Sequence, residues 1–591
     1  MGSNVVDYPR FVHKKSSIAR NTAVNAFAGL LMTFLNLVLT ALLARGLDRD
    51  QFGTWAFLMV LTFNQGYFAL LDGGMSVSAL RKIVHYDHSE RPEDSAEVLA
   101  TLRAYYLYVS AAGSLALFAC GGLLLTAVWP SISTTSVIVV LATLVIRLFA
   151  DTLHASNMMV LESRSLFPQM RLLEIGSLTS WTVMVALVLW ANHGLMTLAI
   201  LSAINSLILV CASTWIVSGH TKSPRGVRFK WRRSIAKELW TTGKWVAIQR
   251  LWSVIYAQMD RTIIAVVLGV ALVGDYEIPY KFQAMGVLIL SVFPSALFPT
   301  VAKLEADENR DRLTGLFHKA TRWTVGLSVP ILITGIALSG PLITLWVGDS
   351  FVHLQGSVSL FLLWPVIASF NVIGSQFLNA MGKTKESFFI AGSSVLVNLI
   401  VSISLVDKFG INGVMLGTVI GIAVVFVPYL VIEQRLFGAG YISWFNEVVV
   451  PVIPSMLIQI PILLVLRTAW TRGTNPFLVV VGGGVATLIG LLIFILISPE
   501  FRRHRSFKAL LTMGALPNQL SCSNYDSTVS YPRRETNESD FSLAVQLLMT
   551  DGFADTNCLN DLRSERDHSL TRLALPLPVS RGVNILARVV Q

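Results

Sequence analysis

The sequence predicts an all-α polytopic membrane protein. Of its 591 residues, 53% are hydrophobic and only 14% are charged, and the mean hydropathy is +0.62. Apolar runs of about 20 residues, long enough for a helix to cross the hydrocarbon core of a bilayer, recur along the chain. A transmembrane β-barrel would instead show shorter segments of alternating polar and apolar residues, which this sequence lacks.

The sequence contains fourteen such runs, which we predict to be transmembrane helices. The first follows a polar, basic N-terminus and is too long for a signal-peptide core, so we interpret it as a helix. The predicted spans are residues 21–44, 55–79, 104–128, 136–160, 172–191, 195–217, 245–268, 276–304, 323–347, 357–378, 387–406, 413–432, 448–466 and 477–497.

The distribution of Lys and Arg predicts the orientation. Most of these residues fall in loops on one face of the predicted membrane, and such an excess marks the cytoplasmic side, so both termini are expected to be cytoplasmic. The clusters on that face are Lys14, Lys15 and Arg20; Arg81, Lys82 and Arg91; Lys222, Arg225, Arg228, Lys230, Arg232, Arg233 and Lys237; and Lys303, Arg310, Arg312 and Lys319. The net charge of +11 therefore reflects topology and does not indicate nucleic-acid binding.

A weak internal duplication divides the spans into two sets of six. Gly53 follows the first span and Gly274 follows the seventh, and the two differ by 221 positions, as do Lys82 and Lys303. Six spans per unit is an even number, so both units should have the same orientation and be related by an axis along the membrane normal.

The expected organisation follows from this repeat. It comprises a cytoplasmic N-terminus (1–20), an N-lobe (21–218), a basic cytoplasmic loop (219–244), a C-lobe (245–436), two extra C-terminal helices (445–497) and a polar cytoplasmic tail without fixed structure (498–591). The basic loop is interpreted as a solvated topology signal, with contact to anionic membrane lipids as the alternative. The four cysteines lack metal-ligand spacing, so no metal or other cofactor is expected.

Two stretches resemble the polysaccharide transport family, the Wzx-type polysaccharide flippases of the multidrug/oligosaccharidyl-lipid/polysaccharide exporter superfamily. They are Leu47…Phe52-Gly53-Thr54-Trp55 with Leu71-Asp72-Gly73-Gly74, and Met259-Asp260-Arg261…Leu268-Gly269…Val273-Gly274-Asp275-Tyr276. The resemblance covers about residues 15 to 435 and implies a transporter of lipid-linked oligosaccharides in the bacterial inner membrane, not an enzyme. Its implied partners are that lipid, a polysaccharide polymerase and an export complex. The two extra helices exceed the usual twelve, although related lipid II flippases carry such a pair.

Charged residues inside the spans are the candidate binding groups, because ionised side chains at that depth usually mark a pathway or an internal pair. A sugar headgroup needs a hydrated cavity, and a diphosphate needs cations. We therefore predict a cationic cavity lined by Arg147, Arg250, Arg261 and Lys281. The competing interpretations are a neutralising pair of Arg147 with Asp151 at (i, i+4), and snorkelling of Arg250 and Lys281 to the membrane surface.

Three carboxylates accompany these cations. Asp151, Asp260 and Glu277 are candidates either for charge pairing or for ion coupling. Asp260 could neutralise Arg261 or exchange a coupling ion, and Glu277 lies close to Lys281 in the sequence. Whether a proton or a sodium gradient is used stays open at this point.

Other functions remain as alternatives. A lipid II flippase would fit the fourteen spans, and a cation-coupled drug exporter of the same superfamily would favour carboxylates and aromatic residues over the basic residues seen here. A membrane scaffold of a polysaccharide assembly complex would use the long tail. A membrane glycosyltransferase is disfavoured, because no loop is large enough for a nucleotide-sugar domain.

Overall fold

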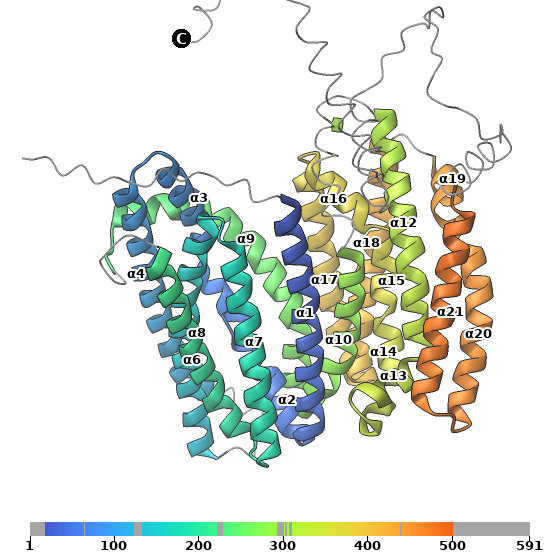
Figure 1. Ribbon diagram of the computed structural model, residues 1–591, viewed down its shortest axis with the longest axis horizontal. Helices are drawn as coiled ribbons and strands as arrows, with labels where there is room; N and C mark the ends of the chain where they lie inside the picture. Colours follow the sequence, from blue (N-terminus) through green and yellow to red (C-terminus); the bar gives the residue numbers. More distant parts are fainter. Residues whose placement is uncertain are drawn as a thin grey trace, which may run out of the picture. The chain divides into compact units, whose positions relative to one another are not determined.

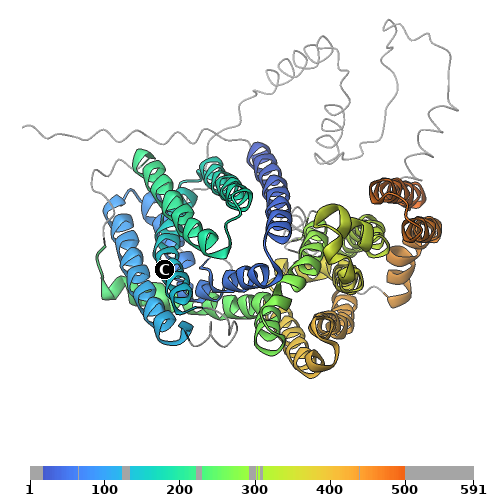
Figure 2. The ribbon, with the colours of Figure 1, turned by 90° about the horizontal axis from the view of Figure 1, so that it is seen from below.

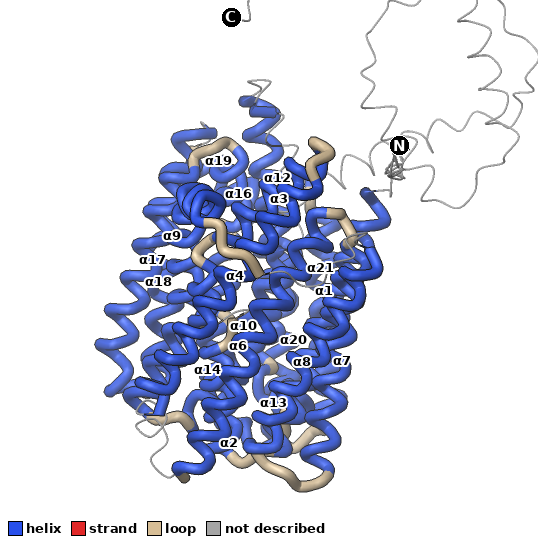
Figure 3. Tube along the Cα trace, turned by 90° about the vertical axis from the view of Figure 1, so that its left-hand side faces the viewer, coloured by secondary structure: helices blue, strands red, loops and turns tan. Residues whose placement is uncertain are grey.

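The computed structural model describes residues 18–63, 66–122, 133–220, 229–291, 301, 304–305, 310–437 and 440–499. All secondary structure within these ranges is helical (Figure 3). The predicted N-terminal segment before residue 18 and nearly all of the predicted tail lie outside the described residues.

The helices follow one another along the whole described chain (Figure 1). Their bounds are α1 (Ile18–Gly46), α2 (Arg49–Leu58), η1 (Met59–Leu61), η2 (Tyr67–Asp72), α3 (Met75–His88), α4 (Pro92–Ala116), η3 (Leu117–Gly121), α6 (Thr134–Ser163), α7 (Phe167–Trp190), α8 (Leu195–His220), α9 (Arg233–Ile263), η4 (Ile264–Leu268), α10 (Ala271–Ser291), α12 (Arg310–Ala337), α13 (Ser339–Trp346), η5 (Asp349–Leu354), α14 (Gln355–Phe361), α15 (Leu363–Ser369), α16 (Val372–Ala380), α17 (Thr384–Phe409), α18 (Ile411–Phe437), α19 (Tyr441–Trp444), η6 (Phe445–Val449), η7 (Val450–Val452), α20 (Ile453–Thr471) and α21 (Pro476–Ile497).

Eleven segments of the described chain are long and apolar enough to cross a membrane, which confirms a polytopic all-α protein. Three of the fourteen predicted spans are not among them. Span 55–79 is broken into short helices, whereas spans 104–128 and 276–304 each run into residues outside the described ranges. The total of fourteen therefore remains a prediction.

The second predicted span is discontinuous because its sequence contains a polar residue and a glycine pair near its end. Helix η2 ends at Asp72, and α3 begins at Met75 after Gly73 and Gly74, whose φ angles are +57° and +70°. Only glycine adopts such left-handed conformations at low cost. Non-helical backbone at membrane depth is tolerated where it is buried in protein, and in transporters it often lies at the binding site.

Helix α9 packs on both halves of the chain. Its first part, within the predicted basic loop, buries Leu239 completely among Met75, Ala79 and other N-lobe residues. In addition, Glu238 forms an ion pair with Lys82 of α3. Its last part is followed directly by η4, where Ile264 is fully buried against C-lobe residues. One continuous helix therefore connects the two lobes.

The two extra C-terminal helices, α20 and α21, lie side by side at the edge of the bundle (Figure 2). The fully buried Gln459 of α20 donates through Nε2 to the Pro330 carbonyl oxygen and to Thr334 Oγ1 of α12, at 2.8 Å each. Thr334 in turn lies 2.6 Å from Thr487 of α21. Polar side chains of this kind join helices in a membrane, where the hydrophobic effect does not drive their association.

Candidate functional site

Residues of the two predicted lobes meet along a line of contacts that we call the seam, defined by Arg49–Asp275, Gly53–Gly274, Tyr67–Thr262 and Asp72–Arg250. In each pair the first residue belongs to the N-lobe, and the second belongs to α9 or α10. The seam therefore runs along α9 and α10 from the predicted cytoplasmic half of the membrane toward the opposite end.

At that opposite end, the duplicated glycines lie against each other. A methyl group on Gly274 would stand 3.0 Å from the backbone nitrogen of Gly53, and one on Gly53 would stand 2.1 Å from the Val270 carbonyl oxygen. The residues that revealed the duplication thus allow α2 and α10 to approach closely. Since any side chain would force the backbones apart, the glycines are needed for this packing.

An ion pair covers the same end of the seam. Asp275 is 2% exposed, and it accepts a hydrogen bond from Arg49, which raises the pKa of the Arg49 guanidinium above its usual value. His353 Nε2 lies 3.7 Å from the same carboxylate. These residues line a pocket of about 720 Å³, together with Phe52 and Phe351. Sequence analysis did not select Arg49 or Asp275 as site residues, although Asp275 adjoins the duplicated Gly274.

Asp72, within the break of the second predicted span, holds Arg250. The carboxylate is 2% exposed and lies 3.6 Å from Arg250 Nη1, whose side chain is 34% exposed. Asp72 also accepts hydrogen bonds from the Tyr106 hydroxyl at 2.7 Å and from Ser76 Oγ at 2.8 Å. Gly74 is in close contact with Gly243 of α9. The Leu71-Asp72-Gly73-Gly74 motif therefore serves the contact between the lobes.

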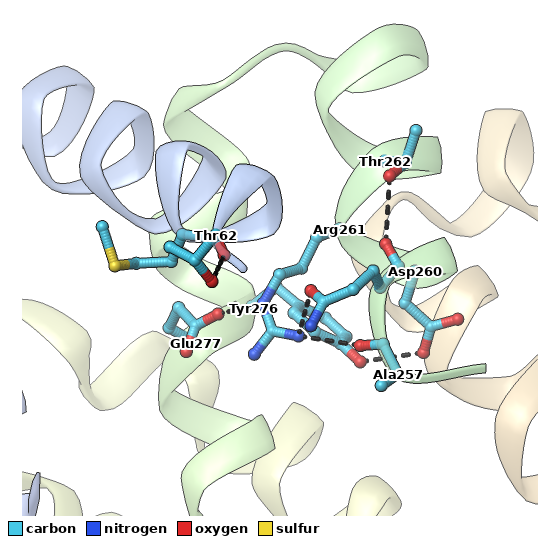
Figure 4. Close-up of polar contacts among 9 residues, drawn as sticks. Thr62, Ala257, Asp260, Arg261, Thr262, Tyr276 and Glu277 are labelled. Carbon is cyan, nitrogen blue, oxygen red and sulfur yellow. Dashed lines mark hydrogen bonds and ion pairs between the residues drawn. The ribbon is translucent and has the colours of Figure 1, made fainter. Parts of the chain in front are cut away.

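Arg261 is held inside the C-lobe by its own set of partners (Figure 4). Its guanidinium forms an ion pair with Glu277 of α10 and donates to the Ala257 carbonyl oxygen at 2.9 Å. The ring of Tyr280 lies 4.1 Å from the guanidinium carbon, within the range of a cation–π contact. Because Arg261 is only 7% exposed, we infer that this pair fixes the α9–α10 hairpin.

Asp260 points away from this pair, toward α17 and α18 (Figure 4). Its Oδ2 accepts hydrogen bonds from the Tyr276 hydroxyl and from Thr418 Oγ1, both at 2.8 Å. Its Oδ1 is buried without a hydrogen-bond partner in the described part of the chain. This geometry therefore does not favour the alternative in which Asp260 neutralises Arg261.

Neutral oxygen atoms surround the Asp260 carboxylate. Asn398 Oδ1 lies 3.4 Å from Thr418 Oγ1 and accepts a hydrogen bond from Ser402 at 2.8 Å, and Ser402 also reaches the Val414 carbonyl oxygen at 3.2 Å. Carboxylate, amide, hydroxyl and carbonyl oxygens are ligands that suit hard cations. These residues were not among the site residues predicted from the sequence. The spacing of Asn398 and Ser402, one turn apart in an apolar helix, is the sequence feature that could have indicated them.

Arg147 and Asp151 lie elsewhere, on the face of α6 that packs on α8. Arg147 Nη1 donates to Ser202 Oγ at 3.5 Å, and Asp151 lies close to Ser206 one turn further on. No ion pair within 4 Å joins Arg147 to Asp151 in the described residues. Lys281 is half-buried one turn after Glu277, and it likewise has no ion pair within the described ranges. The four predicted cations thus fall into three groups: Arg261 with Lys281, Arg250 on the seam, and Arg147 in the N-lobe.

The sequence profile of a family described as polysaccharide biosynthesis protein matches residues 42–356, more than half of the chain. The chain is 22% identical over 405 residues to the putative O-antigen transporter of Shigella flexneri, covering 67% of this chain and 93% of that protein. It is 23% identical over 191 residues to the probable flippase AglR of Haloferax volcanii, covering 32% of this chain but only 40% of that protein. The structure of the lipid II flippase MurJ in its inward closed conformation shares the fold, with a TM-score of 0.62 and 16% identity over 83% of this chain and 100% of that one.

Proposed function

Because the chain belongs to the polysaccharide biosynthesis protein family, we propose that it flips a polyprenyl-diphosphate-linked oligosaccharide from the cytoplasmic to the outer leaflet of a bacterial inner membrane by alternating access. The glycan would serve exopolysaccharide, O-antigen or capsule synthesis. The names of the two relatives, a flippase and an O-antigen transporter, support this substrate class.

The observation that carries the proposal is the seam. Alternating access requires two lobes that touch through contacts able to break and re-form, with charged groups next to them. The Asp72–Arg250 contact is long at 3.6 Å and partly exposed, so its exchange for a substrate phosphate would leave no isolated buried arginine. Arg250 would then donate to the phosphate in the two-pronged manner that suits guanidinium groups.

Lys281 and Arg147 are the other proposed contacts of the anionic headgroup. Within the described residues, neither forms an ion pair within 4 Å, although Asp151 lies near Arg147 and Glu277 lies near Lys281. Arg261 is proposed to act on the substrate only indirectly, because its partners Glu277, Tyr280 and Ala257 already satisfy it. Outward movement of an anion is also favoured by an inside-negative membrane potential, by about 2.3 kcal/mol per charge per 100 mV.

We further propose Asp260 as the ion-coupling residue, where a proton or a sodium ion would be exchanged. Support comes from its free Oδ1 and from the oxygen atoms of Asn398 and Thr418 around it. In proteoliposomes, Asp260→Asn should abolish the response of flipping to the gradient that drives the wild type. A variant that still responds fully to both a pH and a sodium gradient would refute this role.

The proposed function is tested with purified protein in proteoliposomes and a fluorescent polyprenyl-diphosphate oligosaccharide. The wild type should flip this lipid, and Lys281→Ala and Arg250→Ala should slow the transport at least about tenfold, equivalent to about 1.4 kcal/mol. Arg472→Ala, which removes an exposed arginine in the turn after α20, is the matched control and should keep the wild-type rate.

Competing functions give different results in the same assay. Preferential movement of lipid II would favour the lipid II flippase, an assignment that the shared fold and the two extra helices make the strongest alternative. Export of a cationic drug without any lipid flipping would indicate a drug exporter. A scaffold would show neither activity, and truncation after Arg505 would abolish polymer synthesis in cells, whereas a flippase should tolerate that truncation.

A further inference from the structure

A carboxyl group outside the seam is completely enclosed in the C-lobe. Glu433 of α18 is 0% exposed, and neither of its carboxyl oxygens has a hydrogen-bond partner in the described part of the chain. A methyl group placed on Gly374 would stand 1.6 Å from Glu433 Oε1. The carboxyl group therefore packs directly on the backbone of α16, in space that only a glycine leaves free.

A buried apolar cluster lies beside Glu433. Leu378 of α16, Ile390 of α17 and Val425 of α18 form a buried cluster here with Tyr429, and Ile432 and Leu436 pack against it. An ionised carboxylate at this place would lose its hydration without gaining a charge partner or a hydrogen bond. Because that loss is far more costly than burying a neutral acid, the group is expected to carry a proton while the helices are packed in this way.

Within the described residues, neither carboxyl oxygen of Glu433 has a hydrogen-bond partner, and no ion pair neutralises it. On its own helix, the Tyr429 phenol lies nearby, next to Ser387 of α17. The exposed Arg435 follows Glu433 by two residues, a spacing that places the two side chains on different faces of the helix. Helix α16 carries no titratable side chain between Val372 and Ala380. Lys385 and Glu386, in the first turn of α17, are exposed to the surroundings.

Two basic residues of the neighbouring α12 contact Glu447 of η6. His318 Nδ1 lies 2.8 Å from Glu447 Oε2, and Arg322 Nη1 donates to the Glu447 carbonyl oxygen at 3.2 Å. These groups are therefore committed to the contact between α12 and η6.

Of the two helices that enclose Glu433, one begins nearby after a break in the helical path, and the other contains a proline. Helix α15 ends at Ser369 and α16 begins at Val372, so the helical path breaks one turn or less before Gly374. Helix α18 contains Pro428 five residues before Glu433, and a proline removes a backbone hydrogen bond and permits a kink. The carboxyl group thus lies between two helices that can change direction at that level.

We propose that Glu433 is a proton-binding site of the C-lobe, occupied while α16 and α18 are closed on each other and emptied when they separate. It is distinct from the ion-coupling role proposed for Asp260, which lies on α9 and accepts a hydrogen bond from Thr418 of α18. Glu433 lies on α18 itself and packs on Gly374 of α16. The ligand is a proton, because the apolar cluster of Leu378, Ile390 and Val425 offers no oxygen ligands for a metal cation.

The protonation state can be read without any transport measurement. Infrared difference spectra of the full-length protein at neutral pH should contain the C=O stretching band of a protonated carboxyl, and Glu433→Gln should remove that band. Glu447→Gln is the matched control, because Glu447 is about half exposed and hydrogen-bonded, and it should leave the band unchanged. A wild-type spectrum whose protonated-carboxyl signal is unaffected by Glu433→Gln would overturn the proposal.

A second measurement tests whether the protonation of Glu433 is linked to the separation of α16 and α18. In the wild type, the hydrogen-exchange rate of the backbone amides of α16 and α18 should rise with pH by more than the intrinsic pH dependence of amide exchange. The Glu433→Gln variant, whose side chain cannot ionise, should lose this additional rise. An equal rise in both proteins would contradict the proposal. Neither readout requires flipping, so failure of the proposed transport function would not be confused with failure at Glu433.

Discussion

At the scale of single residues, the buried charges form pairs that local sequence rules do not reveal. Glu277 lies close to Lys281, as the sequence indicates. Its ion pair, however, is formed with Arg261 across the α9–α10 turn. Similarly, Asp72 and Arg250 are 178 positions apart, and only the packing of η2 on α9 brings them together. The sequence identified most of the charged residues of the site but not their partners.

The Arg261–Glu277 pair gives a residue-scale prediction. Breaking it with Arg261→Met or Glu277→Gln should destabilise the protein by about 3–5 kcal/mol, because one buried charge then has no partner. Replacing both with Met should restore most of the stability, since no isolated charge remains. Thermal unfolding in detergent measures this double-mutant cycle, and additive losses would show that the two residues do not interact.

At the scale of elements, hydrophobicity predicted most helices. The Leu71-Asp72-Gly73-Gly74 motif lies near the end of the second predicted span, and the structure has an interruption at Gly73 and Gly74. The extension of α9 back to Arg233 could not be seen, because residues 233–244 are polar and were predicted as a loop. Their helical structure depends on packing against the N-lobe through residues such as Leu239.

Leu239 tests whether α9 is anchored to the N-lobe. Leu239→Ala should cost about 2–5 kcal/mol of stability, since the side chain is completely buried. Leu251 is 41% exposed on the same helix, so Leu251→Ala should change the stability by less than about 1 kcal/mol. Equal effects of the two substitutions in thermal unfolding would argue against the anchor.

The close approach of α2 and α10 gives a second element-scale prediction. Gly53→Ala should destabilise the protein by about 1–3 kcal/mol, because its methyl group would overlap the Val270 carbonyl oxygen. Gly176→Ala in α7 is the control, since no atom lies within 4 Å of the added methyl group. It should be neutral or stabilising by up to about 1 kcal/mol, in line with helix propensity. Similar unfolding temperatures for the two variants would contradict the packing argument.

At the scale of the whole molecule, composition and the 221-residue offset predicted a polytopic membrane protein built from two units, and the family resemblance implied a transporter. The family model supports a part in polysaccharide biosynthesis, and the shared fold supports the helical architecture. The single cationic cavity was inferred by assuming that buried cations face one another. In the structure these cations are divided among the seam, the C-lobe and the N-lobe. A buried cation can also pack against a helix face that carries no charge, as Arg147 does against Ser202 of α8. Position along a helix predicts poorly which neighbour a side chain faces.

The central claim is that flipping requires the lobes to separate at the seam. The most direct measurement uses the double variant Arg49→Cys, Asp275→Cys in a protein whose four native cysteines are replaced by serine. A short reducible cross-linker then joins the two introduced cysteines. Flipping of the labelled lipid-linked oligosaccharide in proteoliposomes should stop after cross-linking and return after reduction. Transport at the uncross-linked rate, with the two cysteines fully joined, would contradict the account.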